Sequence, residues 1–123
     1  MTDIPRKTEG TVKSIPTAAH LREAALLISK PGQWTRNTAA RDKSNISIDP
    51  RSADAVRWCA FGAIIGVMGN LYESDSLIYE RLWELDSHRS TLVTINDVFG
   101  RSAAIDELNR LADLAESLET KSC

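Results

Sequence analysis

The stretch RWCAFGAIIGVMG, residues 57–69, is the most apolar run in the chain, and it constrains the fold more than any other segment. Placed on a helix, its side chains and those just before it separate into a bulky stripe and a small stripe. The two stripes consist of Trp58, Phe61, Ile65 and Met68, and of Ala55, Cys59, Gly62, Ala63 and Gly66. A helix that is apolar all round is a buried helix. We therefore predict a central buried helix from about Ser52 to Met68, whose small stripe lets a second helix approach closely.

Cys59 raises the question of a reactive thiol. Thiolate nucleophiles need a lowered pKa, usually from a helix N-terminus or a neighbouring cation. In the predicted helix Cys59 lies about two turns from the start, beyond the strongest part of the helix dipole. It also belongs to the small stripe, and free cysteines are often buried as small apolar residues. We therefore interpret Cys59 as a core residue, with a nucleophile as the alternative.

Three further helices are predicted from apolar spacing and capping residues. The first follows Thr17 and ends at the Pro31–Gly32 pair, the third begins near residues 74–76, and the last is capped by Ser102. Residues 90–95 fit either a helical turn or a strand, and a turn is expected at NDVFG, residues 96–100. The predicted fold is all-α: a small orthogonal or bundle-like domain of about four helices with one long irregular loop, residues 33–51.

The length of 123 residues suits a single domain, which we place at residues 17–119 after a flexible N-terminal tail, residues 1–16. The formal net charge of −2 gives no electrostatic reason to expect nucleic acid as a partner. The N-terminus lacks the apolar core of a signal peptide, and the longest apolar run is too short to span a bilayer. The two cysteines make a poor disulfide framework. We expect a cytoplasmic protein with no membrane partner.

Several common chemistries have no signature in this chain. It contains no glycine-rich phosphate loop and no paired-cysteine metal spacing. Its acidic pairs, such as Glu80 and Glu84, fit solvated helix faces rather than the apolar surroundings that general acid–base catalysis requires. We therefore predict no catalytic residues, no metal and no cofactor.

Two polar loops are the candidate binding sites, residues 33–42 and 96–101. Arginine presents a rigid fork of donors suited to phosphate or carboxylate, and Trp34 could stack on a ring. The candidate ligand-binding residues are Trp34, Arg36, Arg41, Asp42, Arg57, Asn96, Asp97 and Arg101. The structural interpretation, which we favour for these residues because a long loop must satisfy its backbone groups, pairs Arg41 with Asp97 and Arg101 with Asp42. These pairs would attach the long loop to the last helix, with Asn96 and Asp97 as a turn or cap.

Three segments in order resemble a family of small bacterial and phage proteins known only as a domain of unknown function. They are ALLISKPGQWTRNTAARD, the RWC-A-x-G-A helix and N-D-x-x-G-R-S-A before the last helix, and the resemblance covers roughly residues 21–115. The family commonly has tryptophan where this chain has Ile95. The resemblance implies a shared fold and supplies no activity.

The sequence favours a non-enzymatic binding module that engages a protein or a small anionic ligand through the two polar loops. One alternative is a small hydrolase or transferase that uses Asp42 or Asp97 as a base, or Cys59 as a nucleophile. Another, implied by the resemblance alone, is a phage or prophage protein that inhibits or sequesters host components. A homodimer through the second or third predicted helix is a further alternative.

Overall fold

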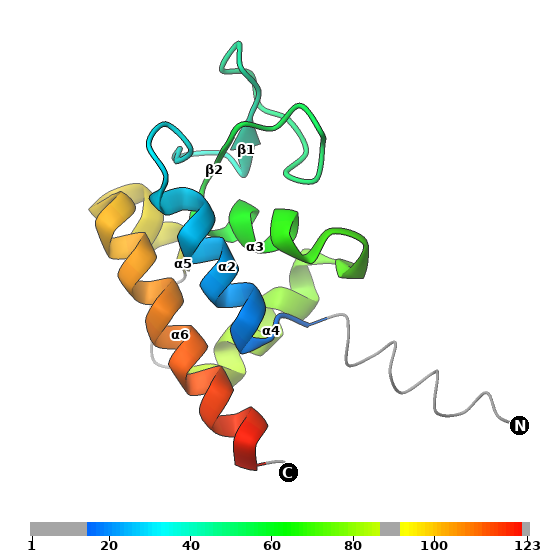
Figure 1. Cartoon of the computed structure of the whole chain (residues 1–123), viewed down its shortest axis with the longest axis vertical. Coiled ribbons are helices and arrows are strands. Elements are labelled where there is room, and N and C mark those ends of the chain that lie inside the picture. Colours follow the sequence, from blue (N-terminus) through cyan, green and yellow to red (C-terminus); the bar gives the residue numbers. More distant parts are fainter. Residues whose placement is uncertain (1–14, 87–91, 122–123) are drawn as a thin grey trace, which may run out of the picture.

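The computed structural model describes residues 15–86 and 92–121, so the predicted tail lies almost entirely outside the described residues. The described chain is mainly helical, with one small antiparallel strand pair (Figure 1). Its elements, in chain order, are α2 (Ala18–Ser29), β1 (Ala40–Arg41), β2 (Arg57–Trp58), α3 (Ala60–Met68), the 3-10 turn η1 (Gly69–Leu71), α4 (Asp75–Leu85), α5 (Leu92–Thr94), the π-helical turn η2 (Ile95–Phe99) and α6 (Arg101–Lys121). The prediction of a mainly helical domain is confirmed. The strand pair was not predicted, so the fold is not strictly all-α.

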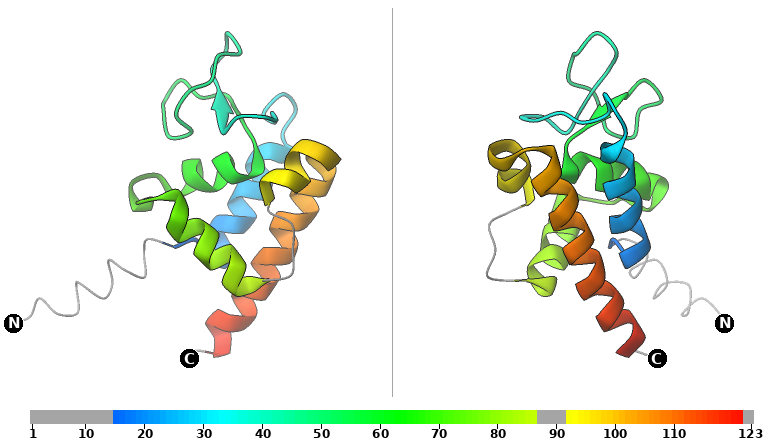
Figure 2. Two further views of the ribbon diagram at one scale, coloured as in Figure 1. Left: turned by 180° about the vertical axis from the view of Figure 1, so that it is seen from behind. Right: turned by 60° about the vertical axis from the view of Figure 1, so that its left-hand side comes forward.

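Helices α2 and α6 run side by side in opposite directions, and α3 crosses behind them (Figures 1 and 2). The segment between α2 and α3, residues 30–58, extends from one end of this helical body, and we call it the loop lobe. The start of α6 and the turn η2 lie next to the base of the loop lobe (Figure 2). The fold therefore brings the two predicted polar loops together at one end of the molecule.

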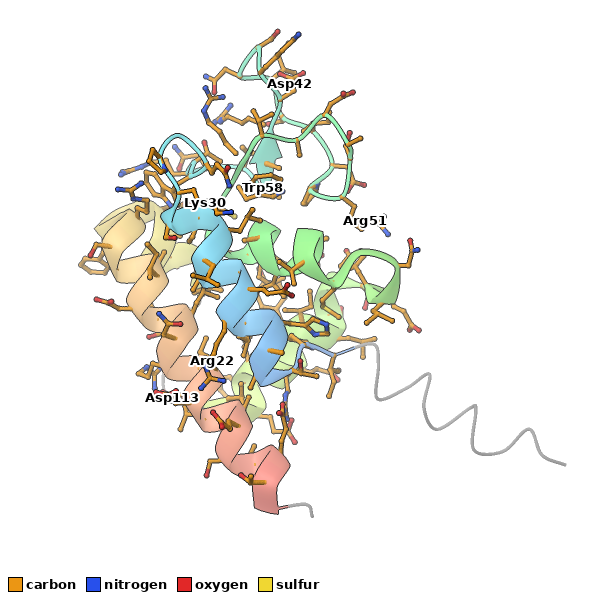
Figure 3. All side chains as sticks on the ribbon, viewed as in Figure 1. Arg22, Lys30, Asp42, Arg51, Trp58 and Asp113 are labelled. Atoms are coloured by element: carbon orange, nitrogen blue, oxygen red, sulfur yellow. The ribbon has the colours of Figure 1, made fainter. Side chains whose placement is uncertain are left out.

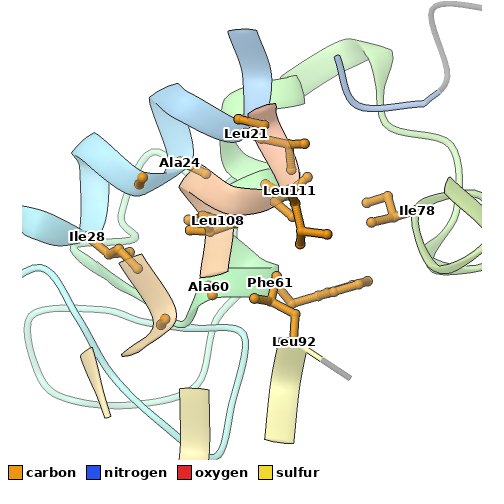
Figure 4. Close-up of a cluster of buried hydrophobic side chains, with 14 of the residues drawn as sticks. Leu21, Ala24, Ile28, Ala60, Phe61, Ile78, Leu92, Leu108 and Leu111 are labelled. Carbon is orange, nitrogen blue, oxygen red and sulfur yellow. The ribbon is translucent and has the colours of Figure 1, made fainter. Parts of the chain in front are cut away.

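The core lies where α2, α3 and α6 meet (Figure 4). Leu21 and Ile28 from α2, Ile64 from α3 and Leu108 from α6 have no exposed surface. Burial of a large aliphatic side chain stabilises a fold by about 1.5–3 kcal/mol. The apolar spacing on α2 and α6 thus identified the faces that the structure buries.

The predicted second helix begins later than expected. Residues 52–56 form turns, Arg57–Trp58 is strand β2, and α3 starts only at Ala60 with Cys59 as its N-cap. Strand β2 pairs with β1, whose Ala40 and Arg41 fall in the predicted irregular loop. The extended form is favoured here because Trp58 exchanges backbone hydrogen bonds with Gln33 and Thr35. On the other side of the loop, Val56 and Cys59 donate to the carbonyl oxygens of Arg41 and Ala39. Tertiary pairing overrides the local helical pattern.

The two glycines in the small stripe of α3 lie against the backbone of the loop lobe, whereas the prediction placed the backbone of another helix there. A Cβ atom at Gly62 would overlap the carbonyl group of Ala39, and one at Gly66 would lie 3.1 Å from the carbonyl oxygen of Pro50. Both glycines therefore let the loop lobe lie directly on the helix. The prediction of a close approach is right, but the approaching segment is the loop.

The C-terminal part of the chain resolves two sequence ambiguities. Residues 92–94 are helical rather than extended, and the expected turn at NDVFG is the π-helical turn η2, which ends at Gly100 with φ +97°. Helix α6 then begins at Arg101, so Ser102 lies inside the helix and the prediction of a Ser102 cap is wrong. Among the described residues no helix has the length and apolar content needed to cross a membrane.

Candidate functional site

Asn96 joins three segments at the base of the loop lobe. It lies in η2, and its side chain is fully buried. Its Oδ1 accepts hydrogen bonds from Trp34 Nε1 at 2.7 Å and from the backbone N–H of Ala60 at 2.9 Å. Its Nδ2 donates to the carbonyl oxygen of Thr35 at 3.1 Å and to Oδ1 of Asp97 at 3.0 Å. A primary amide offers two donors and two acceptor positions, so every one is used.

Asp97 attaches the same loop at a second point. Its Oδ1 accepts from the backbone N–H of Asn37 at 3.0 Å, and its carbonyl oxygen accepts from a terminal nitrogen of Arg36 at 3.1 Å. The guanidinium carbon of Arg36 also lies 5.0 Å from the centre of the Trp34 ring, within the range of a cation–π contact. The exposed Arg36 is therefore held in place against a fixed aromatic ring.

Arg41 organises the interior of the loop lobe. Its Nε donates to Oγ1 of the buried Thr35 at 2.8 Å, and its terminal nitrogens donate to the carbonyl oxygens of Asn45 at 3.1 Å and Arg36 at 3.3 Å. These acceptors come from both sides of the strand β1. The Arg41 side chain, which is half-buried, thus ties the two limbs of the loop together.

Arg57 lies directly opposite Arg41 in the register of the β1–β2 pair. It donates to the carbonyl oxygen of Asp42 at 3.3 Å. The carboxylate of Asp42 is occupied elsewhere, since its Oδ1 accepts from the backbone N–H groups of Ser44 and Ile46 and closes a turn. Like charges directly opposite each other across two strands are destabilising, so an anion beside this pair would relieve their repulsion.

The arginines of the described chain fall into two groups of equal size. The structure describes eight arginines. Four of them form ion pairs with carboxylates of described residues, and the other four do not. The paired arginines are Arg22, Arg51, Arg81 and Arg110. The unpaired arginines are Arg36, Arg41, Arg57 and Arg101, and all four belong to the predicted site.

Figure 3 shows charged side chains on the helical body and on the loop lobe. Arg22 and Asp113 face each other from α2 and α6 on the helical body, at 2.8 Å, whereas Asp42 lies in the outer part of the loop lobe. The sequence shows the same division of charge. Residues 30–58 contain six lysines and arginines and three aspartates, a formal charge of +3, while residues 59–123 contain five basic and eleven acidic residues, a formal charge of −6. The loop lobe is therefore basic although the chain is acidic.

Cys59 occupies the N-cap of α3, not a position two turns inside a helix as predicted. Its Sγ accepts from the backbone N–H of Gly62 at 3.2 Å. A helix N-terminus would lower the thiol pKa, but the side chain is only 6% exposed, and desolvation by this burial raises the pKa of the Cys59 thiol above its ordinary value. Cys59 thus lies at the start of the helix rather than inside it, but its side chain is buried as predicted.

The predicted ion pairs between the loop and the last helix are not formed in the described chain. Arg41 contacts Thr35 and carbonyl oxygens instead of Asp97, and Arg101 has no contact with Asp42. The attachment itself exists, but Asn96 and Asp97 provide it. Trp34 is half-buried, packs against the core and donates its indole N–H to Asn96.

Three residues of the site escaped the sequence reasoning. Thr35 is buried and accepts from Arg41, and no pattern in the sequence separates it from the other polar residues of the loop. The pair Val98 and Phe99 is 64% and 69% exposed. Two apolar residues inside an otherwise polar turn, NDVFG, were a signal that could have indicated an exposed apolar surface.

Comparison with known proteins gives one match. A protein-family model described as a family of unknown function (DUF6197) matches residues 13–114. No curated protein and no solved structure matches the chain. The matched region includes both attachment points of the loop lobe and all four unpaired arginines.

Proposed function

The chain belongs to the DUF6197 family, whose function is unknown, and from this premise we propose that it is a non-enzymatic binding module that holds an anionic group of a protein or small molecule at the loop lobe. The bacterial or phage origin implied by the earlier resemblance remains a prediction. The proposed ligand contacts are Arg36, Arg57 and Arg101, with Arg41 as the residue that shapes the loop around them.

The observation that carries this proposal is the division of the arginines. Guanidinium groups bind carboxylate and phosphate in preference to neutral acceptors, because charge-assisted hydrogen bonds are about twice as strong. Arg36 and Arg57 each donate one hydrogen bond to a carbonyl oxygen, out of the five N–H donors that a guanidinium group carries. Most of their donors are thus available to an anion, on a loop that Asn96 attaches firmly to the helical body.

The contacts of the other candidate residues support binding over catalysis. Asp42 and Asp97 each use one carboxylate oxygen, Oδ1, to accept from two backbone or amide N–H groups. The raised pKa of the buried Cys59 thiol opposes the thiolate form that a nucleophile needs. The alternative of a phage-derived inhibitor depends on the resemblance alone.

Isothermal titration with pyrophosphate at constant ionic strength tests the proposal. Each charge-assisted hydrogen bond contributes about 1.5–3 kcal/mol, so R36Q/R101Q should weaken binding about tenfold or more. R22Q/R51Q is the matched control, since it removes the same net charge from arginines that are 41% and 40% exposed and already paired. Equal weakening by both double variants would show that only net charge matters and would refute the site.

The homodimer predicted through the second or third helix is tested on the same preparations, at the third helix. Trp83 on α4 is 65% exposed, which gives such a contact an apolar residue. Sedimentation velocity should then give a dimer that Trp83→Ser converts to a monomer. A monomer for the unmodified chain at micromolar concentration would remove the homodimer from the proposal.

A further inference from the structure

The turn η2 presents an exposed apolar pair at the edge of the loop lobe. Val98 and Phe99 are 64% and 69% exposed, and Phe99 is the most exposed of the large apolar side chains described. The turn cannot rotate them inward, because Asn96 on the same turn is buried and uses all four hydrogen-bonding positions. Gly100 closes the turn by donating to the carbonyl oxygen of Asn96 at 3.2 Å. The pair is therefore held outward by the fold.

Two unpaired arginines, Arg36 and Arg101, belong to the neighbourhood of this apolar pair, the first by contact and the second by its position in the chain. Arg36 donates to the carbonyl oxygen of Asp97, the residue directly before Val98. Arg101 follows Phe99 by two residues, at the first position of α6, and is exposed. Neither arginine forms an ion pair with any residue that the structure describes. An apolar centre with arginine at its border has the composition of a protein-binding hot spot.

We infer that this surface, made of Arg36, Val98, Phe99 and Arg101, binds a protein segment in which an aliphatic or aromatic side chain stands beside carboxylates. This inference rests on the proposed function and names the partner of the same site. Charge complementarity selects acidic side chains, and the exposed apolar pair selects a neighbouring apolar side chain. A small inorganic anion would satisfy the guanidinium groups and leave Val98 and Phe99 uncovered.

The charge distribution favours a peptide over a nucleic acid strand. A single strand bound by stacking on Phe99 needs a positive track for its successive phosphates. Residues 59–123, which include α6 and η2, carry a formal charge of −6, and Asp97 lies next to the surface itself. A short acidic peptide needs positive charge only at the two arginines.

Selection from a random dodecapeptide library on the immobilised full chain tests the inference. Enriched peptides should contain Asp or Glu next to Leu, Ile, Phe or Trp, and replacing that apolar residue by Ser should weaken binding about tenfold or more. Phe99→Ser in the protein should remove this preference, whereas Leu26→Ser, at a similarly exposed apolar residue on α2, should keep it. R36Q/R101Q should weaken every enriched peptide.

The outcomes separate this inference from the proposed function. If pyrophosphate binds through the four unpaired arginines but the enriched peptides show no dependence on Phe99, the inference is wrong and the proposed function stands. If an oligothymidylate of twelve nucleotides binds more tightly than the best peptide and depends on Phe99, the partner is a nucleic acid and the inference is also wrong. If neither pyrophosphate nor any acidic peptide binds, both fall together.

Discussion

Trp34 and Asn96, 62 residues apart in sequence, are joined by a hydrogen bond of 2.7 Å from the indole nitrogen to the amide oxygen. The bond connects the loop after α2 with the turn before α6. The same amide oxygen receives the first backbone N–H of α3. One buried side chain thus sets the position of the loop lobe, and with it three of the four unpaired arginines, Arg36, Arg41 and Arg57.

Asn96→Ala should destabilise the protein strongly. The substitution leaves the indole N–H of Trp34, the N–H of Ala60 and the carbonyl of Thr35 without their partner, and each buried orphan group costs about 1–3 kcal/mol. We expect a loss of about 3 kcal/mol or more in the free energy of unfolding, measured by urea titration. Asn109→Ala, at an exposed position of α6, is the control and should change stability by less than about 0.5 kcal/mol. Equal effects of the two substitutions would contradict the role of Asn96.

Gly62→Ala distinguishes loop packing from helix propensity by the sign of its effect. Alanine favours a helix over glycine by about 1 kcal/mol, so the substitution would stabilise α3 if nothing lay against it. Here the added Cβ would overlap the carbonyl of Ala39, and overpacking costs about 1–3 kcal/mol or more. We expect a lower melting temperature in differential scanning calorimetry. A melting temperature at or above that of the unmodified protein would show that the loop does not lie on α3.

His20 should make stability depend on pH. Its Nδ1 accepts from the backbone N–H of Thr17 at 3.1 Å, which requires the neutral ring, and burial lowers the pKa of His20 below 6.5, against the opposing effect of Glu23 and Glu119. The unfolded chain then takes up this proton first. The contribution of His20 is complete above about pH 6.5 and is lost as the pH falls through the lower folded pKa.

The comparison with His20→Gln isolates this contribution. Glutamine at the same position can still accept from Thr17 in a capping box, but it does not titrate. Urea titrations at pH values between about 7 and 5 should show a steeper loss of stability for the unmodified chain than for the variant. Parallel curves would mean that the proton on His20 has no effect on folding.

Cys59 should resist thiol reagents in the folded protein. Its side chain is 6% exposed, so a reagent has little access to the sulfur. Burial also raises the thiol pKa, which lowers the fraction of reactive thiolate. With Cys123→Ser in the background, labelling by a disulfide reagent at about pH 8 should be at least about a hundredfold slower than in urea, because it requires local opening. Labelling of the native chain at the unfolded rate would restore the nucleophile hypothesis.

The sequence was sufficient where side-chain periodicity decides the structure. The apolar spacing of Leu21, Ala24 and Ile28 identified the buried face of α2, and these residues are buried in the fold. It failed at Arg57–Trp58, because the helical pattern of α3 extends backward into residues that pair instead with Ala40 and Arg41. Strands of only two residues each are too short to leave a periodic pattern in the sequence.

The sequence predicted which residues belong to the candidate site, but not which of them bond to one another. Polar density identified the two loops, and the fold brings them together. Opposite charge predicts that Arg41 pairs with Asp97 and Arg101 with Asp42. In the structure, Oδ1 of Asp97 and of Asp42 accepts instead from the backbone N–H groups of Asn37 and Ser44, respectively. Which donor satisfies which acceptor depends on backbone positions that a single sequence does not contain.

The central claim is that Arg36, Arg57 and Arg101 hold an anionic group on a loop that Arg41 shapes. The most direct measurement is a nuclear magnetic resonance titration of the arginine Nε–Hε signals with pyrophosphate at fixed ionic strength. We predict that the signals of Arg36, Arg57 and Arg101 shift together along one saturation curve, while those of the paired Arg22 and Arg110 stay in place. Shifts of similar size at all arginines, or none at these three, would contradict the claim.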